Sequence, residues 1–456
     1  MRVKLIGVSD EPRKSESVDR AKHHYRPSAN APHSCRKAKS NGIYARSLTG
    51  SSSRTNCPVE RRKEKEEMMS DENAHALDPV RPVELPSRQW WRFLEREDWL
   101  VVGWVLAIKI LLFIFGAKSF RILENKPLPG RFGWLDIWNR WDSLHYLQVA
   151  QFGYNAASIM KAWFYPLFPW CTRVVAYGVS HNYLVSAFIV SGFSSVAAAI
   201  LLRRIVQFDH DEGISQWAVW FFLIFPTAYY LHIAYAESLF LALVLGSILA
   251  AISNRWWLAG VLGAMAWMTR ANGIILLPTL AVEAIHQWII TKRWNWRWLW
   301  IAIVPAGFAV YLFMNWKVTG DPFAFLRMRK RLFTMEASWP WVGIRNAIGN
   351  LRGTPNYAEI VGAQELYFAV LGFVCMILSW IKLRPIHAAW ITGNWFLIAS
   401  VTFLVSTPRY TLTMYPVFML FGLVGRSRLW TAVITVWSLL FLALFSSMFI
   451  RNLWAF

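Results

Sequence analysis

Long apolar runs follow one another from Trp99 to the C-terminus, with only short polar breaks between them. Runs approaching bilayer thickness must satisfy their backbone hydrogen bonds internally, which favours helices. The chain is 55% hydrophobic over 456 residues and contains 28 Trp, a composition typical of a membrane protein. We therefore predict an all-α, polytopic membrane helical bundle of about 11 spans. The runs lie at 99–116, 183–202, 215–233, 237–252, 256–270, 273–290, 298–316, 365–381, 386–405, 410–425 and 429–449.

The first 88 residues differ from the rest. They are rich in Ser, Lys, Arg and Asn and have no sustained apolar period, so they cannot bury enough surface to offset the entropy of ordering. We predict a disordered basic tail over 1–88 and a transmembrane domain over 89–456. The tail lacks the apolar region of a secretory signal, and Met68 and Met69 suggest a downstream start.

The net charge of +21 follows membrane topology, so no nucleic-acid partner is expected. The basic residues of alternate short loops define a cytoplasmic side by the positive-inside rule. These residues are Arg92 and Arg96, Arg203 and Arg204, Arg255, Lys292, Arg293 and Arg297, Lys382 and Arg384, and Arg426 and Arg428.

The opposite, non-cytoplasmic face receives every polar cluster of unusual content. It also receives a long loop, 317–364, that carries basic residues against the charge rule. A basic outer loop suits a phosphate-bearing lipid headgroup, although incidental solvated charge is the alternative. The residues concerned are Arg327, Arg329, Lys330 and Arg331.

Motifs for several other chemistries are missing from the sequence. The four cysteines are far apart, without metal-ligand spacing, so neither a zinc site nor a disulfide framework is predicted. No phosphate-binding glycine loop or D-x-D motif occurs. We expect no metal and no cofactor, and a sugar donor would have to arrive on a lipid.

The first outer loop contains Arg140-Trp141-Asp142 and His145. If this loop opens a helix, Asp142 and His145 share a face, and the helix dipole stabilises an ionised Asp142 near the N-terminus. Such a carboxylate can accept a proton from a hydroxyl as a general base. The alternative is that Asp142 only caps the helix. For His145 alone, a packed side chain is the commoner role.

Three further charged residues lie at outer ends of spans. Glu237 begins a span, and an acid at that position costs about 2–3 kcal/mol on insertion scales. It is predicted either to cap the helix or to orient Arg270 or a sugar hydroxyl. Arg270 and Arg409 either snorkel toward the interface or bind a lipid-linked phosphate, for which a guanidinium is well matched.

Several motifs follow one another in a fixed order along the chain. They are Arg140-Trp141-Asp142 with His145-Tyr146 and Gly153-Tyr154, Phe164-Tyr165-Pro166-Leu167-Phe168-Pro169, Phe225-Pro226 with Ala234-Tyr235-Ala236-Glu237-Ser238-Leu239-Phe240, Thr269-Arg270-Ala271-Asn272-Gly273, Gly320-Asp321-Pro322 with Ala324-Phe325, and Pro408-Arg409-Tyr410 with Pro416. Taken together, these motifs resemble the PIG-V family of membrane mannosyltransferases. The similarity covers most of the chain from Trp99 onward and excludes the tail. Its departures include Ala236 and Ala271, where relatives carry hydroxyl-bearing residues.

The resemblance implies a GT-C fold and transfer of a hexose, typically mannose, from a polyprenyl-phosphate donor to a glycolipid or protein acceptor. Asp142 would be the general base, and one displacement would invert the anomeric carbon. The implied substrate-binding residues are Arg140, Trp141, His145, Tyr165, Glu237, Arg270 and Arg409.

The implied compartment is a bacterial plasma membrane or, in a eukaryote, the endoplasmic reticulum with glycosylphosphatidylinositol (GPI) anchor synthesis as the pathway. Whether a partner subunit is needed stays open. The alternative function is a transporter or flippase of lipid-linked sugars, since many spans with scattered charge also describe that class.

Overall fold

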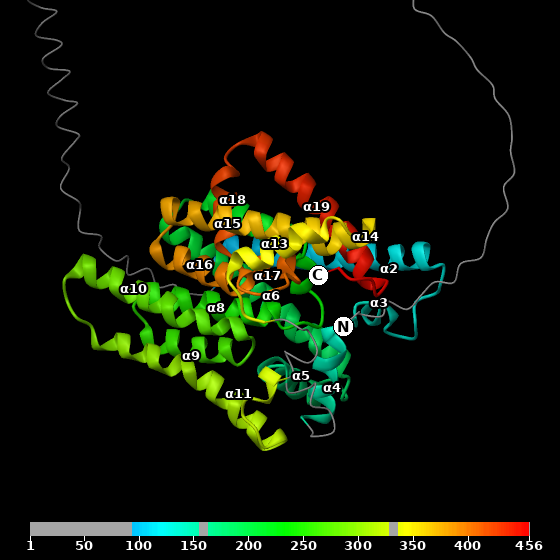
Figure 1. Cartoon of the computed structure of the whole chain (residues 1–456), viewed down its shortest axis with the longest axis horizontal. Helices are drawn as coiled ribbons and strands as arrows, with labels where there is room; N and C mark the ends of the chain where they lie inside the picture. Colours follow the sequence, from blue (N-terminus) through cyan, green and yellow to red (C-terminus); the bar gives the residue numbers. More distant parts are fainter. Residues whose placement is uncertain (1–93, 155–162, 328–335, 456) are drawn as a thin grey trace, which may run out of the picture. The chain divides into compact units, whose positions relative to one another are not determined.

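The computed structural model describes residues 94–154, 163–327 and 336–455, and the predicted tail at 1–88 lies outside them. The described residues form helices joined by turns and loops (Figure 1), and their β-structure is limited to one isolated β-bridge between Ala337 and Val401. The all-α prediction is confirmed. The helices are α2 (Arg96–Glu124), α3 (Gly133–Asp136), α4 (Asp142–Phe152), α5 (Leu167–Gly178), α6 (Tyr183–Asp209), α7 (Glu212–Ile224), η3 (Ala228–Leu231), α8 (Glu237–Ile252), α9 (Trp256–Trp267), η4 (Ala271–Ile275), α10 (Leu276–Thr291), η5 (Trp296–Ile303), α11 (Val304–Thr319), α13 (Pro340–Asn350), α14 (Pro355–Tyr357), η6 (Ala358–Ala363), α15 (Gln364–Lys382), α16 (Pro385–Ala399), α17 (Thr407–Thr413), α18 (Pro416–Val424) and α19 (Arg428–Ile450).

Six helical segments among the described residues are long and apolar enough to cross a membrane. Two shorter apolar helices, α8 and α9, match predicted runs. The count of about 11 spans therefore stays a prediction. The six segments are Arg96–Glu124, Tyr183–Asp209, Ala271–Thr291, Trp296–Thr319, Pro355–Lys382 and Arg428–Ile450.

Two predicted runs are interrupted at prolines. The run 215–233 ends as a helix at Ile224, ahead of Phe225-Pro226, and the run 410–425 breaks at Met414 and Tyr415 before Pro416. Proline has no backbone N–H and disfavours helical geometry in the residue before it. Apolar content alone did not reveal these breaks.

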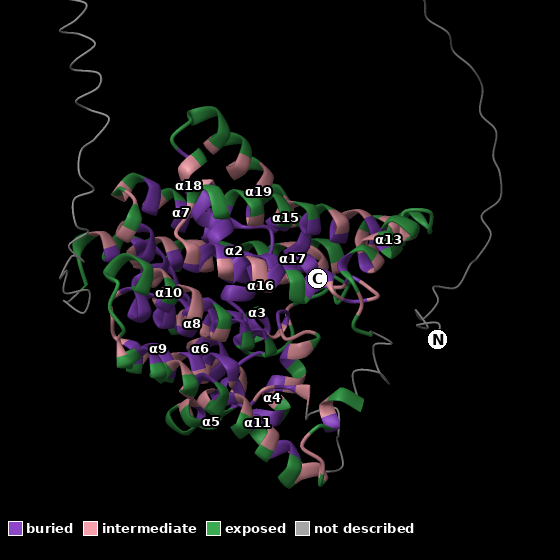
Figure 2. Cartoon of the chain, turned by 60° about the vertical axis from the view of Figure 1, so that its left-hand side comes forward, coloured by how far each residue is buried: buried purple, intermediate pink, exposed green. Residues whose placement is uncertain are grey.

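Helix α8 forms the centre of the described domain. It packs against α6 and α9, and almost all its side chains are buried. Figure 2 shows buried residues around α8 and α16, whereas α19 carries many exposed ones. The N-terminus of α8 is therefore buried inside the domain, and α8 begins with the acidic residue Glu237.

A group of ion pairs joins α2, α6 and α7 at the side of the domain that is predicted to be cytoplasmic. Arg203 is 1% exposed, and it donates to Asp98 at 2.7 Å and to Glu212 at 2.9 Å. Arg204 also binds Asp98, at 2.7 Å. Arg203 and Arg204, which the sequence analysis used to define the cytoplasmic side, therefore also form ion pairs between helices.

The predicted topology can be tested with two exposed arginines on opposite sides, Arg293 and Arg352. In sealed vesicles, we expect a membrane-impermeant maleimide added on the non-cytoplasmic side to label an Arg352→Cys variant and not an Arg293→Cys variant. The reason is that charged reagent cannot cross the hydrocarbon core. The unsubstituted protein gives the background from native cysteines. The reverse pattern would invert the assignment of every loop.

Candidate active site

Helix α4 begins at Asp142, so the predicted position of this acid at a helix N-terminus is confirmed. The capping alternative is not supported, because the N-cap residue is Trp141 and no side chain makes a cap hydrogen bond. The Asp142 carboxylate instead accepts from Arg409 Nη1 at 2.7 Å. It is 38% exposed and thus accessible.

The turn before Asp142 has an unusual backbone. Trp141 has a φ of 54° and a ψ of −123°, a conformation that costs on the order of 1–3 kcal/mol for a residue with a side chain. Two contacts hold the turn: Tyr235 donates its hydroxyl to the Arg140 carbonyl at 2.9 Å, and the Trp141 ring meets Trp454 edge to face at 5.3 Å. The strain lies directly beside the candidate base.

Glu237 is the first residue of α8 and is fully buried. The N-cap of this helix is Ala236, and the Glu237 Oε1 atom accepts from Arg270 and from Arg409. Of the two predicted roles, the contacts support the one in which Glu237 orients Arg270. The buried Oε2 atom has no hydrogen-bond partner among the described residues.

Asp142, Arg409, Glu237 and Arg270 therefore form a continuous chain of ion pairs, which we call the charge ladder. Its two acids and two arginines sum to zero formal charge. Arg270 is 8% exposed and the Arg409 side chain 12%, so neither snorkels to the interface. The ladder joins four segments that are far apart in the sequence.

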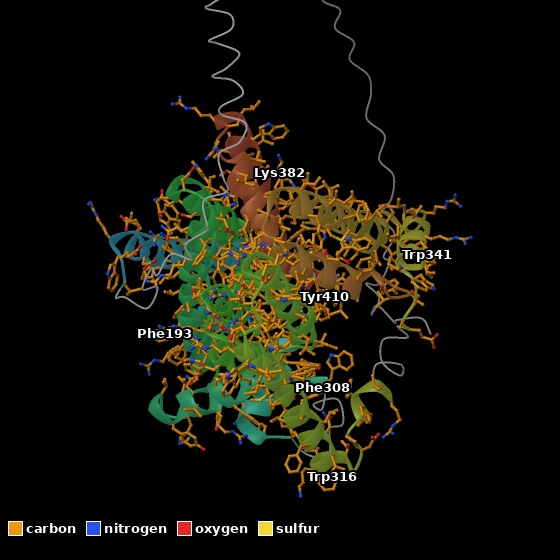
Figure 3. All side chains as sticks on the ribbon, turned by 90° about the vertical axis from the view of Figure 1, so that its left-hand side faces the viewer. Phe193, Phe308, Trp316, Trp341, Lys382 and Tyr410 are labelled. Carbon is orange, nitrogen blue, oxygen red and sulfur yellow. The ribbon has the colours of Figure 1, made fainter. Side chains whose placement is uncertain are left out.

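Aromatic rings lie against both guanidinium groups of the ladder. Arg409 lies 4.8 Å from the ring centre of Tyr230 and 4.7 Å from that of Tyr235, and Arg270 lies 5.4 Å from that of Tyr410, which is labelled in Figure 3. Cations over ring faces are stabilised by about 0.5–2 kcal/mol each. The rings also exclude water, which strengthens the ion pairs.

Each of the other predicted site residues contacts a different neighbour. Arg140 donates from Nε to the Ile450 carbonyl at 3.4 Å, and Trp141 is 38% exposed. His145 stacks on Phe164 at 5.0 Å, and Tyr165 stacks on Tyr311 at 4.0 Å. The Tyr165 ring therefore packs on another aromatic side chain and not on a charge of the ladder.

The segment with Tyr165 is nevertheless fixed to the ladder through the backbone. The Leu167 amide donates to the Met268 carbonyl at 3.1 Å, two residues before Arg270. Phe308, labelled in Figure 3, stacks on Trp267 at 5.0 Å and continues the aromatic layer from Tyr311. Tyr165 thus borders an aromatic wall beside the Arg270 turn.

Several residues contact the site without having been predicted as site residues. Tyr146, which the sequence placed only within a motif, packs between Phe164 and Tyr235. Burial raises the pKa of its phenol above the ordinary value, and the Glu237 and Asp142 carboxylates act in the same direction, so Tyr146 stays neutral. Glu365 and Trp454 were also missed, because nothing in their sequence neighbourhoods indicates which segment they meet.

The basic outer loop is only partly described. Arg327 pairs with Asp321, so it is not an isolated headgroup ligand, whereas Arg329, Lys330 and Arg331 lie outside the described residues. No group of three or more His, Cys, Asp or Glu side chains suited to a metal occurs in the described ranges. That catalysis needs no metal or cofactor stays a prediction.

The fold and the site define a polytopic helical membrane protein with a buried charge ladder at its candidate active site. Residues 132–311 match the family model described as Mannosyltransferase (PIG-V), which confirms the resemblance inferred from the motifs. The matched segment contains Asp142, Glu237 and Arg270, and Arg409 follows it.

One curated relative is GPI mannosyltransferase 2 of Schizosaccharomyces pombe, which is 26% identical over 141 residues. The alignment covers 30% of this chain and 30% of that protein, so the chain matches less than a third of that relative's length.

Two solved structures are similar at low TM-scores. ArnT from Cupriavidus metallidurans, bound to undecaprenyl phosphate, has a TM-score of 0.43 and 13% identity, covering 72% of this chain and 60% of that chain. AglB from Archaeoglobus fulgidus, in complex with an inhibitory peptide and a dolichol-phosphate, has a TM-score of 0.40 and 11% identity, covering 76% and 55%. Neither similarity bears on the details of the site.

Removing Glu237 should destabilise the protein strongly. A Glu237→Ala variant leaves two buried guanidinium groups without their shared carboxylate, and breaking a buried pair in this way costs about 3–5 kcal/mol. Thermal unfolding in detergent measures the change. Glu124→Ala is the matched control, because Glu124 pairs with the more exposed Arg451, and such pairs contribute about 0–1 kcal/mol. Equal melting temperatures for the two variants would contradict this account.

Proposed function

We propose that the protein is a membrane glycosyltransferase that moves a hexose, mannose in the first instance, from a polyprenyl-phosphate donor to a glycolipid or protein acceptor on the non-cytoplasmic face. The observation that carries the proposal is the charge ladder, in which the accessible acid Asp142 pairs with Arg409, and the buried acid Glu237 joins Arg409 to Arg270. The family match over residues 132–311 supports mannose as the sugar.

In the proposed reaction, Asp142 accepts the proton of an acceptor hydroxyl. The hydroxyl oxygen forms a bond to the anomeric carbon while the bond from that carbon to the phosphate oxygen breaks. The electron pair of the broken bond leaves with polyprenyl phosphate. A single displacement of this kind inverts the anomeric carbon, and proton removal by a positioned base contributes about 10²–10⁴-fold to rate.

The arginines supply the complementary charge. Arg409 uses Nε and Nη1 for the two carboxylates, and its guanidinium carries further N–H groups on Nη2. Arg270 contacts Glu237 through Nη1. Donors held in place before the reaction stabilise the charge that develops on a leaving phosphate. Glu237 would keep both guanidinium groups aimed at that position.

The residues near the ladder suit a sugar that is carried on a lipid. Trp141 directly precedes Asp142, and His145 lies one helical turn beyond it, so both would face a sugar ring bound at Asp142. Tyr165, stacked on Tyr311, would border the same substrate from the side of the Arg270 turn. A lipid-linked donor would reach the ladder from the bilayer. The membrane would be the plasma membrane of a bacterium or the endoplasmic reticulum of a eukaryote, where a GPI precursor would be the acceptor.

The decisive variant is Asp142→Asn, which keeps the shape of the side chain and removes the base. With polyprenyl-phosphate mannose as donor, we expect kcat for sugar transfer to fall by about 10²–10⁴-fold. Radiolabelled product in reconstituted vesicles measures the rate. The matched control is Asp136→Asn in α3, six residues earlier and outside the ladder, which should transfer at the rate of the unsubstituted protein.

Two outcomes would contradict the proposal. Normal activity in the Asp142→Asn variant would remove Asp142 as base. An unsubstituted protein that moves the intact lipid-linked sugar across the membrane without forming a glycosidic bond would instead be a transporter or flippase.

A further inference from the structure

We propose that Glu365 is a positioning residue that holds Arg409 in the charge ladder. The inference rests on the proposed function, in which Arg409 faces the leaving phosphate. Glu365 begins no recognised motif, and sequence analysis assigned it only to the edge of an apolar run. Its contacts give it a more specific role.

Both carboxylate oxygens of Glu365 accept hydrogen bonds from the backbone of a distant turn. Oε1 accepts from the Ser406 amide at 2.7 Å, and Oε2 accepts from the Thr407 amide at 2.8 Å. Glu365 is 1% exposed, so these bonds form away from water. A carboxylate held at two points fixes the position and the direction of the turn that it binds.

The turn needs such support. Helix α17 is seven residues long, and the first amides of a helix have no partner within it. Its N-cap, Ser406, makes no side-chain cap and lies in the left-handed region at φ 59°, which costs about 1–2 kcal/mol for a residue with a side chain. Glu365 supplies acceptors for the amide of this N-cap residue and for the first amide of the helix.

Arg409 lies two residues beyond the Thr407 amide, which is less than one helical turn. The residue between them, Pro408, is held through its carbonyl by the Thr227 hydroxyl at 3.0 Å. A rotation at Ser406 and Thr407 would therefore displace the Arg409 guanidinium from both Asp142 and Glu237. The long Arg409 side chain would amplify a small shift of the backbone.

The chain entering this turn is held as well. Asn346 in α13 donates to the Thr402 carbonyl at 2.7 Å, and Ala337 bridges Val401. These contacts fix the approach to the turn up to Thr402. Glu365 binds the chain a few residues later, at Ser406 and Thr407, where the helix that carries Arg409 begins. Glu365 therefore fixes the start of the helix that carries Arg409, and Thr227 holds the next residue.

A positioning role and a purely structural role differ in a double-mutant cycle. We expect Glu365→Ala to lower kcat/KM for sugar transfer by about 10²-fold, the loss expected from a misplacement of about 1 Å. In an Arg409→Ala background, the same substitution should lower transfer less than about threefold, because the group that it positions is already gone. The drop in melting temperature should be similar in both backgrounds.

Two further variants sharpen the test. Glu365→Gln keeps one acceptor oxygen and should retain more transfer activity than Glu365→Ala. Glu359→Ala is the matched control, because Glu359 is an exposed acid six residues earlier, outside the turn, and it should transfer normally. An equal loss of transfer from Glu365→Ala with and without Arg409 would overturn the positioning role, as would unchanged transfer.

A measurement independent of activity separates this inference from the proposed function. In an experimental structure of the Glu365→Ala variant, we expect the Arg409 guanidinium to leave the Asp142 and Glu237 carboxylates. Intact ion pairs in that variant would overturn the positioning role even if the unsubstituted protein transfers sugar. If the unsubstituted protein transfers no sugar but Arg409 moves in the variant, the proposed reaction fails and the positioning role stands.

Discussion

The contact between Arg409 and two carboxylates is the interaction on which the rest of the site depends. Arg409 binds Asp142 on one side and Glu237 on the other, so it brings the start of α4 to the start of α8. Glu237 adds Arg270, which carries the turn after α9 into the same cluster. Without Arg409 the candidate base would lose its guanidinium partner, and the buried Glu237 carboxylate would face a single guanidinium.

Burial raises the desolvation cost of the ladder charges and also strengthens the interactions between them. Charges removed from water are tolerated only when they are paired and hydrogen-bonded, and the ladder pairs each of its four residues. The rings of Tyr230, Tyr235 and Tyr410 cover the guanidinium groups. Interactions in such a water-poor region are stronger than at a surface. In the proposed reaction, the same region would hold the leaving phosphate without first reorganising solvent.

The sequence predicts most of the long helices and the charged residues of the site. It does not predict which of them meet, because that depends on contacts between residues far apart in the chain. Apolar runs revealed most long helices, and motif order revealed Asp142, Glu237, Arg270 and Arg409 as candidates. Periodicity did not show that these four meet, because pairing depends on tertiary packing. Prolines divided two predicted runs, and the short helices α5 and α13 lie outside the predicted runs because they are not of membrane length. Glu365 gave no local signal, since its partners are backbone amides 41 and 42 residues away.

The proposed reaction requires the ladder to receive a lipid-linked sugar phosphate. An experimental structure with a non-hydrolysable polyprenyl-phosphate mannose analogue would show where that phosphate binds. We expect the phosphate within hydrogen-bonding distance of Arg409 and Arg270, with the anomeric carbon facing the exposed side of Asp142. A phosphate bound elsewhere, with the four ladder residues still paired only to one another, would contradict the proposed reaction.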